Sequence, residues 1–180
     1  ILFRGYAAAR GIEIARAGFE TIGIDVDKSK IEAVRNGRSF IGDVKDSELA
    51  EVKGKFTATT NFKVLATCDI VNICVPTPFT ASKDPDVTYI EDAGRRVAKY
   101  FKPGQLVILR STTYPETTEK VLEPILECKG RKVGRDYYLS FVPERIDPGN
   151  HRFNTRTTPV VVGGVTKACT DLTVDFYSRF

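Results

Sequence analysis

The sequence predicts a doubly wound α/β fold, in which a mostly parallel sheet carries helices on both of its faces. Short apolar runs alternate along the chain with segments of helical periodicity, as strand–helix–strand crossovers require. One run, DIVNICV at 69–75, is apolar almost throughout, which is typical of a parallel strand buried on both faces. Polar residues directly follow several of these runs, and that edge of such a sheet is where ligands bind.

The elements can be assigned in order along the chain. A strand at 1–4 leads through Gly5 into a helix that Gly18 closes, and a second strand covers 19–27. Asp27 is placed to cap the next helix, which ends at Gly37. The other predicted elements are a helix at 46–52, a strand at 69–75, a helix at 88–101, a strand at 105–112, a helix at 117–128, strands at 136–144 and 158–164, and a terminal helix.

The bulk composition favours one folded domain and excludes several classes of protein. The chain has 180 residues, of which 42% are hydrophobic and 28% charged, and this size suits a single domain at 1–180. Its 27 basic and 23 acidic residues are mixed, so no basic patch predicts nucleic-acid binding. No apolar run approaches the roughly 20 residues of a membrane span, so no membrane interaction is expected.

The cysteines indicate reduced thiols rather than disulfides or a metal site. Cys68, Cys74, Cys128 and Cys169 show no C-x-x-C spacing, and His151 is the one histidine available to partner them. This usage favours a cytoplasmic protein, and Cys74, inside an apolar run, is interpreted as a small core residue. The chain has no methionine and begins inside a predicted strand, so we expect it to be part of a longer protein.

The opening loop is ambiguous when taken alone. A dinucleotide-binding loop of the form G-x-G-x-x-G brings backbone amides close to a pyrophosphate, and here Gly5 is the one glycine in place. Ala7 and Ala8 are the next smallest substitutes. An ordinary strand-to-helix turn explains the segment equally well.

Asp25 favours the nucleotide-binding interpretation. It ends the second predicted strand about 20 residues after Gly5, where an acidic side chain can accept hydrogen bonds from the ribose hydroxyls of an adenosine. A carboxylate there would repel a 2′-phosphate, which favours NAD over NADP. Lys30 could lie along the same ribose.

Three further strand ends carry candidate site residues. Thr77 stands between two prolines in ICVPTPF, which stiffen the backbone and hold its hydroxyl at the end of a strand. Thr112 lies in LRSTTYPETT; in that segment Thr117 or Thr118, with Glu119, is interpreted as a helix cap. In FVPERIDPGN, Glu144, Arg145 and Asp147 follow an apolar strand on a proline-flanked segment, which indicates recognition or proton transfer, with a surface ion-pair cluster as the alternative.

Together these segments resemble the NAD-binding domain of the UDP-glucose/GDP-mannose dehydrogenase family. The resemblance spans essentially the whole chain and is most specific in ICVPTPF, RSTTYPETTE and FVPERIDPGNHRFNTRTTPVVVGG. The last segment is most similar to the branch that oxidises UDP-N-acetylglucosamine or UDP-N-acetylmannosamine. The resemblance implies a cytoplasmic homodimeric enzyme of polysaccharide biosynthesis, which uses two NAD to convert the C6 alcohol of the sugar to a carboxylate.

The resemblance also implies a role for each candidate residue. Gly5, Tyr6 and Ala7 would line the pyrophosphate loop, and Asp25 and Lys30 would hold the adenosine ribose. Thr77 and Thr112 would lie along the cofactor. Glu144, assisted by Thr112, would position or activate the water that releases a covalent intermediate from a cysteine. The remaining implied residues, which would border the nucleotide sugar, are Arg145, Ile146 and Asp147.

The chain departs from the family pattern at two places. Phe3 and Ala8 stand where the family's loop has glycines, and none of the four cysteines lies in the context of the family's nucleophile. These departures support a non-catalytic nucleotide-binding module as one alternative to the UDP-N-acetylhexosamine enzyme. A UDP-glucose 6-dehydrogenase is the alternative within the same class of enzyme.

Overall fold

The computed structural model describes residues 6–40, 44–80, 85–144 and 158–180. The chain divides into two compact units, of which the first contains Ile1–Phe62, Arg145–Pro159 and Arg179–Phe180 and the second Lys63–Glu144 and Val160–Ser178. The predicted opening strand at 1–4 lies outside the described residues.

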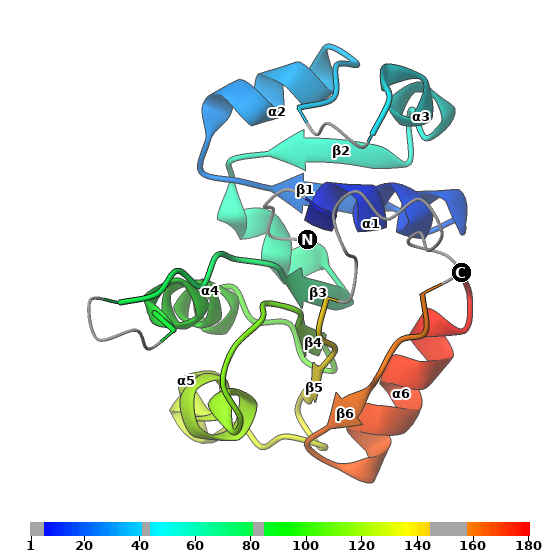
Figure 1. Ribbon diagram of the computed structural model, residues 1–180. Helices are drawn as coiled ribbons and strands as arrows, with labels where there is room; N and C mark the ends of the chain where they lie inside the picture. Colours follow the sequence, from blue (N-terminus) through cyan, green and yellow to red (C-terminus); the bar gives the residue numbers. More distant parts are fainter. Residues whose placement is uncertain (1–5, 41–43, 81–84, 145–157) are drawn as a thin grey trace. The chain divides into compact units, whose positions relative to one another are not determined.

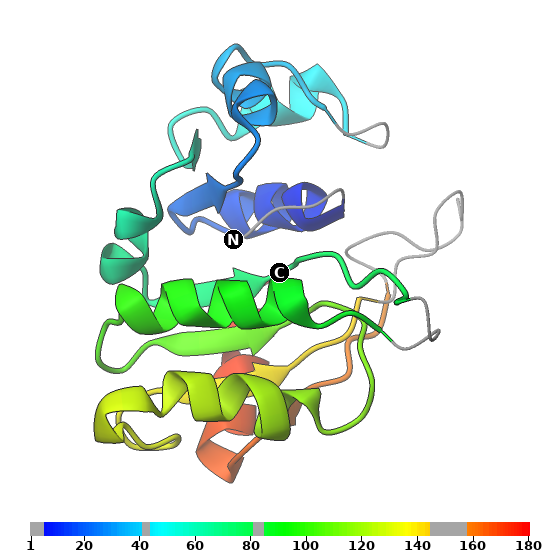
Figure 2. The ribbon, with the colours of Figure 1, turned by 90° about the vertical axis from the view of Figure 1, so that its left-hand side faces the viewer.

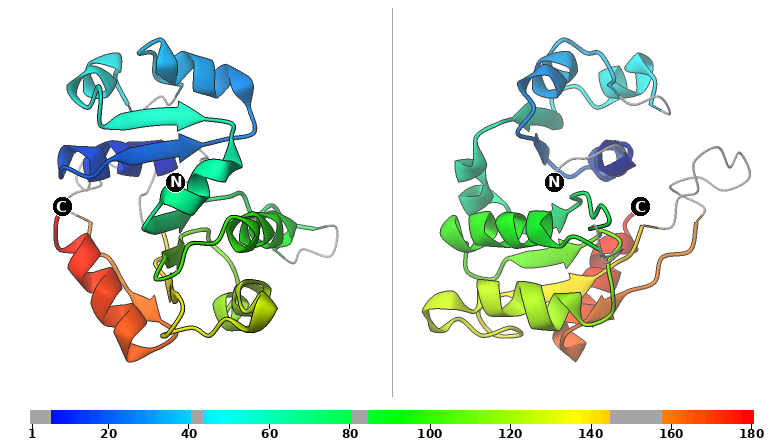
Figure 3. Two further views of the ribbon diagram at one scale, coloured as in Figure 1. Left: turned by 180° about the vertical axis from the view of Figure 1, so that it is seen from behind. Right: turned by 60° about the vertical axis from the view of Figure 1, so that its left-hand side comes forward.

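The first unit is built on two parallel strands. Its described elements are α1 (Tyr6–Arg16), β1 (Thr21–Ile24), α2 (Lys28–Arg35), α3 (Asp46–Glu51) and β2 (Phe56–Thr59). β1 and β2 run in the same direction, with Thr21 opposite Phe56 and Ile24 opposite Thr59 (Figure 3, left). The predicted cap of α2 is confirmed, because the side chain of Asp27 accepts a hydrogen bond from the backbone N–H of Ser29.

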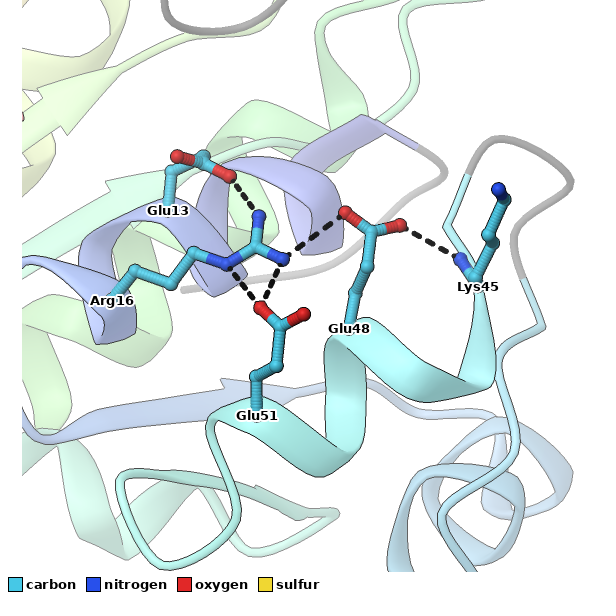
Figure 4. Close-up of polar contacts among 5 residues, drawn as sticks. All are labelled: Glu13, Arg16, Lys45, Glu48 and Glu51. Carbon is cyan, nitrogen blue, oxygen red and sulfur yellow. Dashed lines mark hydrogen bonds and ion pairs between the residues drawn. The ribbon is translucent and has the colours of Figure 1, made fainter.

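An ion cluster joins α1 to α3 within this unit. The guanidinium of Arg16 lies 2.5 Å from Glu13 on its own helix and 2.5 Å from Glu51 on α3 (Figure 4). It also reaches Glu48 at 3.3 Å, whose second oxygen accepts the backbone N–H of Lys45. The hydrogen bond with Glu51 is the largest of the contributions that raise the pKa of Arg16 above its ordinary value.

The second unit contains a four-stranded sheet with helices on both faces. Its strands lie in the order β3 (Ile70–Ile73), β4 (Leu106–Leu109), β5 (Tyr138–Phe141) and β6 (Gly163–Gly164). The first three are parallel, and β6 pairs antiparallel with β5. In Figures 1 and 2, α4 (Thr88–Lys99) and α5 (Glu123–Leu126) lie side by side on one face and α6 (Lys167–Tyr177) covers the other.

The sheet is the hydrophobic core of this unit. Every residue of β4 is at most 1% exposed, as expected for a central parallel strand covered on both faces. Side chains from β5 and from the helical elements that flank the sheet complete the core: Ile90, Val97, Leu122, Leu126, Leu139 and Phe176. The predicted fold class, a mostly parallel sheet between helices, agrees with this arrangement.

The predicted helix at 117–128 is helical in the structure, but it is irregular. A π-helical segment, η2 (Thr118–Leu122), precedes α5, and a 3-10 turn, η3 (Cys128–Gly130), follows it. Pro124 explains the irregularity, because it has no N–H to donate and its ring would clash with the carbonyl four residues earlier in an α-helix. The predicted side-chain cap was also wrong, since the hydroxyl of Thr117 donates to the carbonyl of Tyr114 instead.

The predicted strand at 158–164 was too long. Only Gly163 and Gly164 pair with β5. Continued in the same register, the ladder would bring Val161 opposite Pro143, which has no N–H to donate. Cys74 also differs from expectation, because β3 ends at Ile73 and the cysteine beyond it is only partly buried.

The described ranges contain no helix long and apolar enough to cross a membrane. They also contain no cluster of three or more His, Cys, Asp or Glu side chains that could hold a metal ion. In this part of the chain none of the four cysteines forms a disulfide.

Candidate functional site

Asp25 is held by its neighbours at the carboxyl end of β1. Its side chain is 6% exposed, one oxygen accepts the backbone N–H of Asp27 at 2.9 Å, and the other lies 3.1 Å from Lys30 Nζ. The backbone of Asp25 continues the pairing with β2, because its N–H donates to the carbonyl of Thr59. The cap at Asp27 and the salt bridge to Lys30 therefore fix the carboxylate in one orientation.

This arrangement fits the adenosine ribose of a dinucleotide. A carboxylate oxygen has two lone pairs, and in the described part of the chain each oxygen of Asp25 accepts one hydrogen bond. The remaining lone pairs can accept from ribose hydroxyls, which are donors. The ammonium of Lys30, 3.1 Å from the carboxylate, keeps a cation beside that position.

The strand ends of the second unit are tied together by hydroxyl groups. Ser111 follows β4 and accepts the backbone N–H of Val75, beyond β3, at 2.8 Å. Thr77 donates its hydroxyl to the carbonyl of Thr112 at 2.5 Å. The structure therefore brings together two of the predicted site residues, Thr77 and Thr112, and gives Ser111 a role in joining the loops that carry them.

Glu144 lies beyond β5 and is bound by a buried arginine. The Nη2 of Arg110 lies 2.7 Å from Glu144 Oε2, while its Nη1 donates to the hydroxyl of Tyr177 on α6. The arginine side chain is 2% exposed and that of Glu144 is 22% exposed. The Tyr177 hydroxyl in turn donates to Asn72 on β3 at 3.4 Å.

Electrostatics keep Arg110 charged in this setting. Burial by itself lowers the pKa of a guanidinium, but Tyr177, Cys74 and Glu144 act in the opposite direction. The pKa of Arg110 therefore lies above its ordinary value, and the carboxylate of Glu144 has a permanent cation beside it.

Sequence reasoning missed Arg110, Tyr177 and Asn72. A signal for two of them was present, because Arg110 directly follows four apolar residues and Asn72 interrupts the apolar run DIVNICV. A polar side chain in a strand buried on both faces requires a partner. Nothing in the sequence pattern singled out Tyr177, which lies 67 positions from Arg110.

Some predicted site residues cannot be placed. Gly5 lies outside the described residues, and so do all three predicted sugar-binding residues: Arg145, Ile146 and Asp147. Tyr6 and Ala7 already belong to α1, although their side chains are not among those described.

Parallel strands with a carboxylate and polar groups at their carboxyl ends are typical of the dinucleotide-binding domains of dehydrogenases. The model of the UDP-glucose/GDP-mannose dehydrogenase family, NAD binding domain, matches residues 4–180. The chain belongs to this family. The predicted resemblance, the fold class and NAD as the cofactor are thereby confirmed.

Relatives with known names include several that act on N-acetylated sugars. The chain is 33% identical over 172 residues to a UDP-N-acetyl-D-mannosamine dehydrogenase of Pyrococcus horikoshii, which covers 94% of this chain and 41% of the relative. It is 31% identical over 157 residues to a UDP-N-acetyl-D-glucosamine 6-dehydrogenase of Pseudomonas aeruginosa, covering 87% of this chain and 37% of the relative. The chain thus spans about two fifths of the length of these relatives.

Solved structures of dehydrogenases are similar to this chain in fold. The UDP-D-ManNAc dehydrogenase of Pyrococcus horikoshii superposes with a TM-score of 0.90 at 32% identity, over 100% of this chain and 44% of that one. A GDP-mannose dehydrogenase of Pseudomonas aeruginosa gives 0.88 at 28% identity, over 99% of this chain and 43% of that one.

Proposed function

We propose that this chain is the NAD-binding portion of a UDP-N-acetylhexosamine 6-dehydrogenase, which oxidises the C6 alcohol of the sugar to a carboxylate in two steps. The enzyme works as a cytoplasmic homodimer in polysaccharide biosynthesis. Residues 1–180 form one NAD-binding domain, and the nucleophilic cysteine belongs to a part of the protein outside this chain.

The choice of sugar rests on a difference in similarity. Relatives named as UDP-N-acetyl-D-mannosamine or UDP-N-acetyl-D-glucosamine dehydrogenases share 30–33% of their residues with this chain. A structure of a UDP-glucose dehydrogenase from Pyrobaculum islandicum shares 24%, a level that supports the fold alone. We therefore favour the N-acetylated substrates.

One group of residues in this chain binds NAD. Asp25 and Lys30 hold the adenosine ribose, Gly5, Tyr6 and Ala7 line the pyrophosphate loop, and Thr77 and Thr112 lie along the cofactor. NAD, when bound there, would supply the hydride-accepting chemistry of both oxidations, so two molecules would be needed for each sugar.

The residues that follow β5 act on or bind the nucleotide sugar. Glu144, assisted by Thr112, accepts a proton from the water that releases the acid. Arg145, Ile146 and Asp147 border the nucleotide sugar.

Turnover of the full-length protein tests this proposal. NADH formation is followed at 340 nm with UDP-N-acetylglucosamine, UDP-N-acetylmannosamine and UDP-glucose, each with NAD and with NADP. We expect two NADH for each N-acetylated sugar consumed, with little reduction of NADP. A preference for UDP-glucose would overturn the choice of sugar, and binding of NAD without turnover of any sugar would indicate a non-catalytic module.

A further inference from the structure

Arg110 is where three parts of the second unit meet. It directly follows β4, its guanidinium contacts Glu144 beyond β5, and it reaches Tyr177 at the end of α6. Its backbone N–H also donates to the carbonyl of Ile73, the last residue of β3. Both the backbone and the side chain of this arginine are therefore fixed by the fold.

The two terminal nitrogens of the guanidinium have different partners, one in the packed interior and the other at the candidate site. Nη1 donates to the hydroxyl of Tyr177, a residue that is 8% exposed. That hydroxyl in turn donates to Asn72. Nη2 binds Oε2 of Glu144, whose side chain retains 22% exposure. A buried, permanently charged group thus holds a carboxylate that solvent can still reach.

We propose that Arg110 is a positioning residue, which orients the Glu144 carboxylate for its reaction with the hydrolytic water. This inference rests on the proposed function. In the step concerned, the water oxygen bonds to the acyl carbon of the thioester and the carbon–sulfur bond breaks. The electron pair goes to the cysteine sulfur and Glu144 accepts the proton from water, so nothing is oxidised or reduced.

A purely structural ion pair would behave differently. Removing a buried partner destabilises a protein and lowers all of its activities in parallel. A positioning residue affects the step that its partner serves, and its loss matters little once that partner has been removed. The two roles are therefore separable by measuring the release step and cofactor binding on the same variants.

The experiment compares Arg110→Met, Arg110→Lys, Glu144→Gln and the double variant Arg110→Met/Glu144→Gln in the full-length enzyme. Intact-protein mass spectrometry during turnover detects the covalent sugar adduct, and calorimetry gives the affinity for NAD. Lys102→Met is the matched control, because it removes one cation from an exposed pair with Asp69.

We expect both Arg110→Met and Glu144→Gln to accumulate the adduct and to lose at least about tenfold in kcat, with NAD affinity retained. Arg110→Lys, which keeps the charge without the planar fork, should lie between wild type and Arg110→Met. The double variant should be no slower than Glu144→Gln, and Lys102→Met should turn over like wild type.

Three results would overturn the positioning role while wild type remains active. Arg110→Met could turn over at the wild-type rate without adduct, its effect could multiply with that of Glu144→Gln, or its NAD affinity could fall in parallel with kcat. If Arg110→Met does not fold, the same comparison is made with Arg110→Lys, where absence of any adduct is the contrary result. A wild-type enzyme that reduces no NAD with any UDP-sugar would instead overturn the proposed function.

Discussion

Asp25 offers the most direct test of a single site residue. Its carboxylate is held by Lys30 and by the backbone of Asp27, and it is proposed to accept the ribose hydroxyls of NAD. We expect Asp25→Ala to weaken NAD binding by about 1.5–3 kcal/mol, the contribution of hydrogen bonds to a charged group. Calorimetry on the full-length protein measures this, with Asp25→Asn, which keeps one acceptor, as an intermediate control. Unchanged affinity in Asp25→Ala would remove Asp25 from the cofactor site.

Glu116 carries backbone strain in the loop after β4. It has φ = 71°, and among the described residues Lys129 is the other non-glycine residue with positive φ. A non-glycine residue in this left-handed region destabilises the folded state by roughly 1–2 kcal/mol. Glycine avoids this strain, but its greater conformational entropy in the unfolded chain offsets part of the gain in stability.

We therefore expect Glu116→Gly to raise the free energy of unfolding by about 0.5–1 kcal/mol. The ion pair that is lost with Lys120 is exposed and contributes little. Urea denaturation measures the change, with Glu116→Ala, which keeps a Cβ, as the control. A lower midpoint for the glycine variant than for the alanine variant would show that the loop is not strained.

At the scale of elements, the close approach of β6 to α6 depends on one glycine. A Cβ added at Gly164 would lie 2.3 Å from the backbone nitrogen of Thr170 and 2.8 Å from the carbonyl carbon of Cys169. At Gly163 the nearest atom would be the carbonyl oxygen of Phe141, at 3.9 Å. Backbone atoms cannot move away from an added Cβ as easily as the end of a flexible side chain can.

These adjacent glycines form a matched pair for mutation. We expect Gly164→Ala to destabilise the protein by about 1–3 kcal/mol, because α6 must move away from the sheet. Gly163→Ala should change stability by less than about 0.5 kcal/mol. Thermal and urea unfolding of both variants provide the comparison, and equal effects would mean that α6 can shift without cost.

The elements also show how far local sequence signals reach. The predicted helix at 88–101 and strand at 105–112 correspond to α4 (Thr88–Lys99) and β4 (Leu106–Leu109), because periodicity and apolar runs are local properties. The helix at 117–128 was predicted from its helical pattern, whereas its irregularity comes from Pro124, which acts through a backbone clash. The strand at 158–164 failed because its length depends on its partner β5, and Pro143 in the following residues gives no N–H to extend the pairing.

At the scale of the whole molecule, the rates at which the thiols are chemically modified measure how often the protein unfolds. Cys128 is exposed, whereas Cys169 is 0% exposed and its sulfur accepts the backbone N–H of Leu139. We expect a thiol reagent to modify Cys128 rapidly under native conditions and Cys169 only at the rate of unfolding. Peptide mass mapping over time, repeated with Cys128→Ser, distinguishes the two. Fast modification of Cys169 in the native state would show that α6 detaches locally.

The sequence by itself determined the fold class, the order of most elements and which strand ends carry polar groups. Asp25, Thr77, Thr112 and Glu144 were selected because each lies close beyond an apolar run, at the end of a predicted strand where ligands of parallel sheets are expected. The family was evident from the same segments. These properties are local in the chain or follow from general rules of topology.

Only the tertiary structure decided how those groups are held. It placed Lys30 against Asp25, joined Thr77 to the backbone of Thr112 and put Arg110 between Glu144 and Tyr177. The last contact connects residues 67 positions apart, and no periodicity records such a distance. The physical reason is that a buried charge takes its partners from whichever elements the packing brings to it.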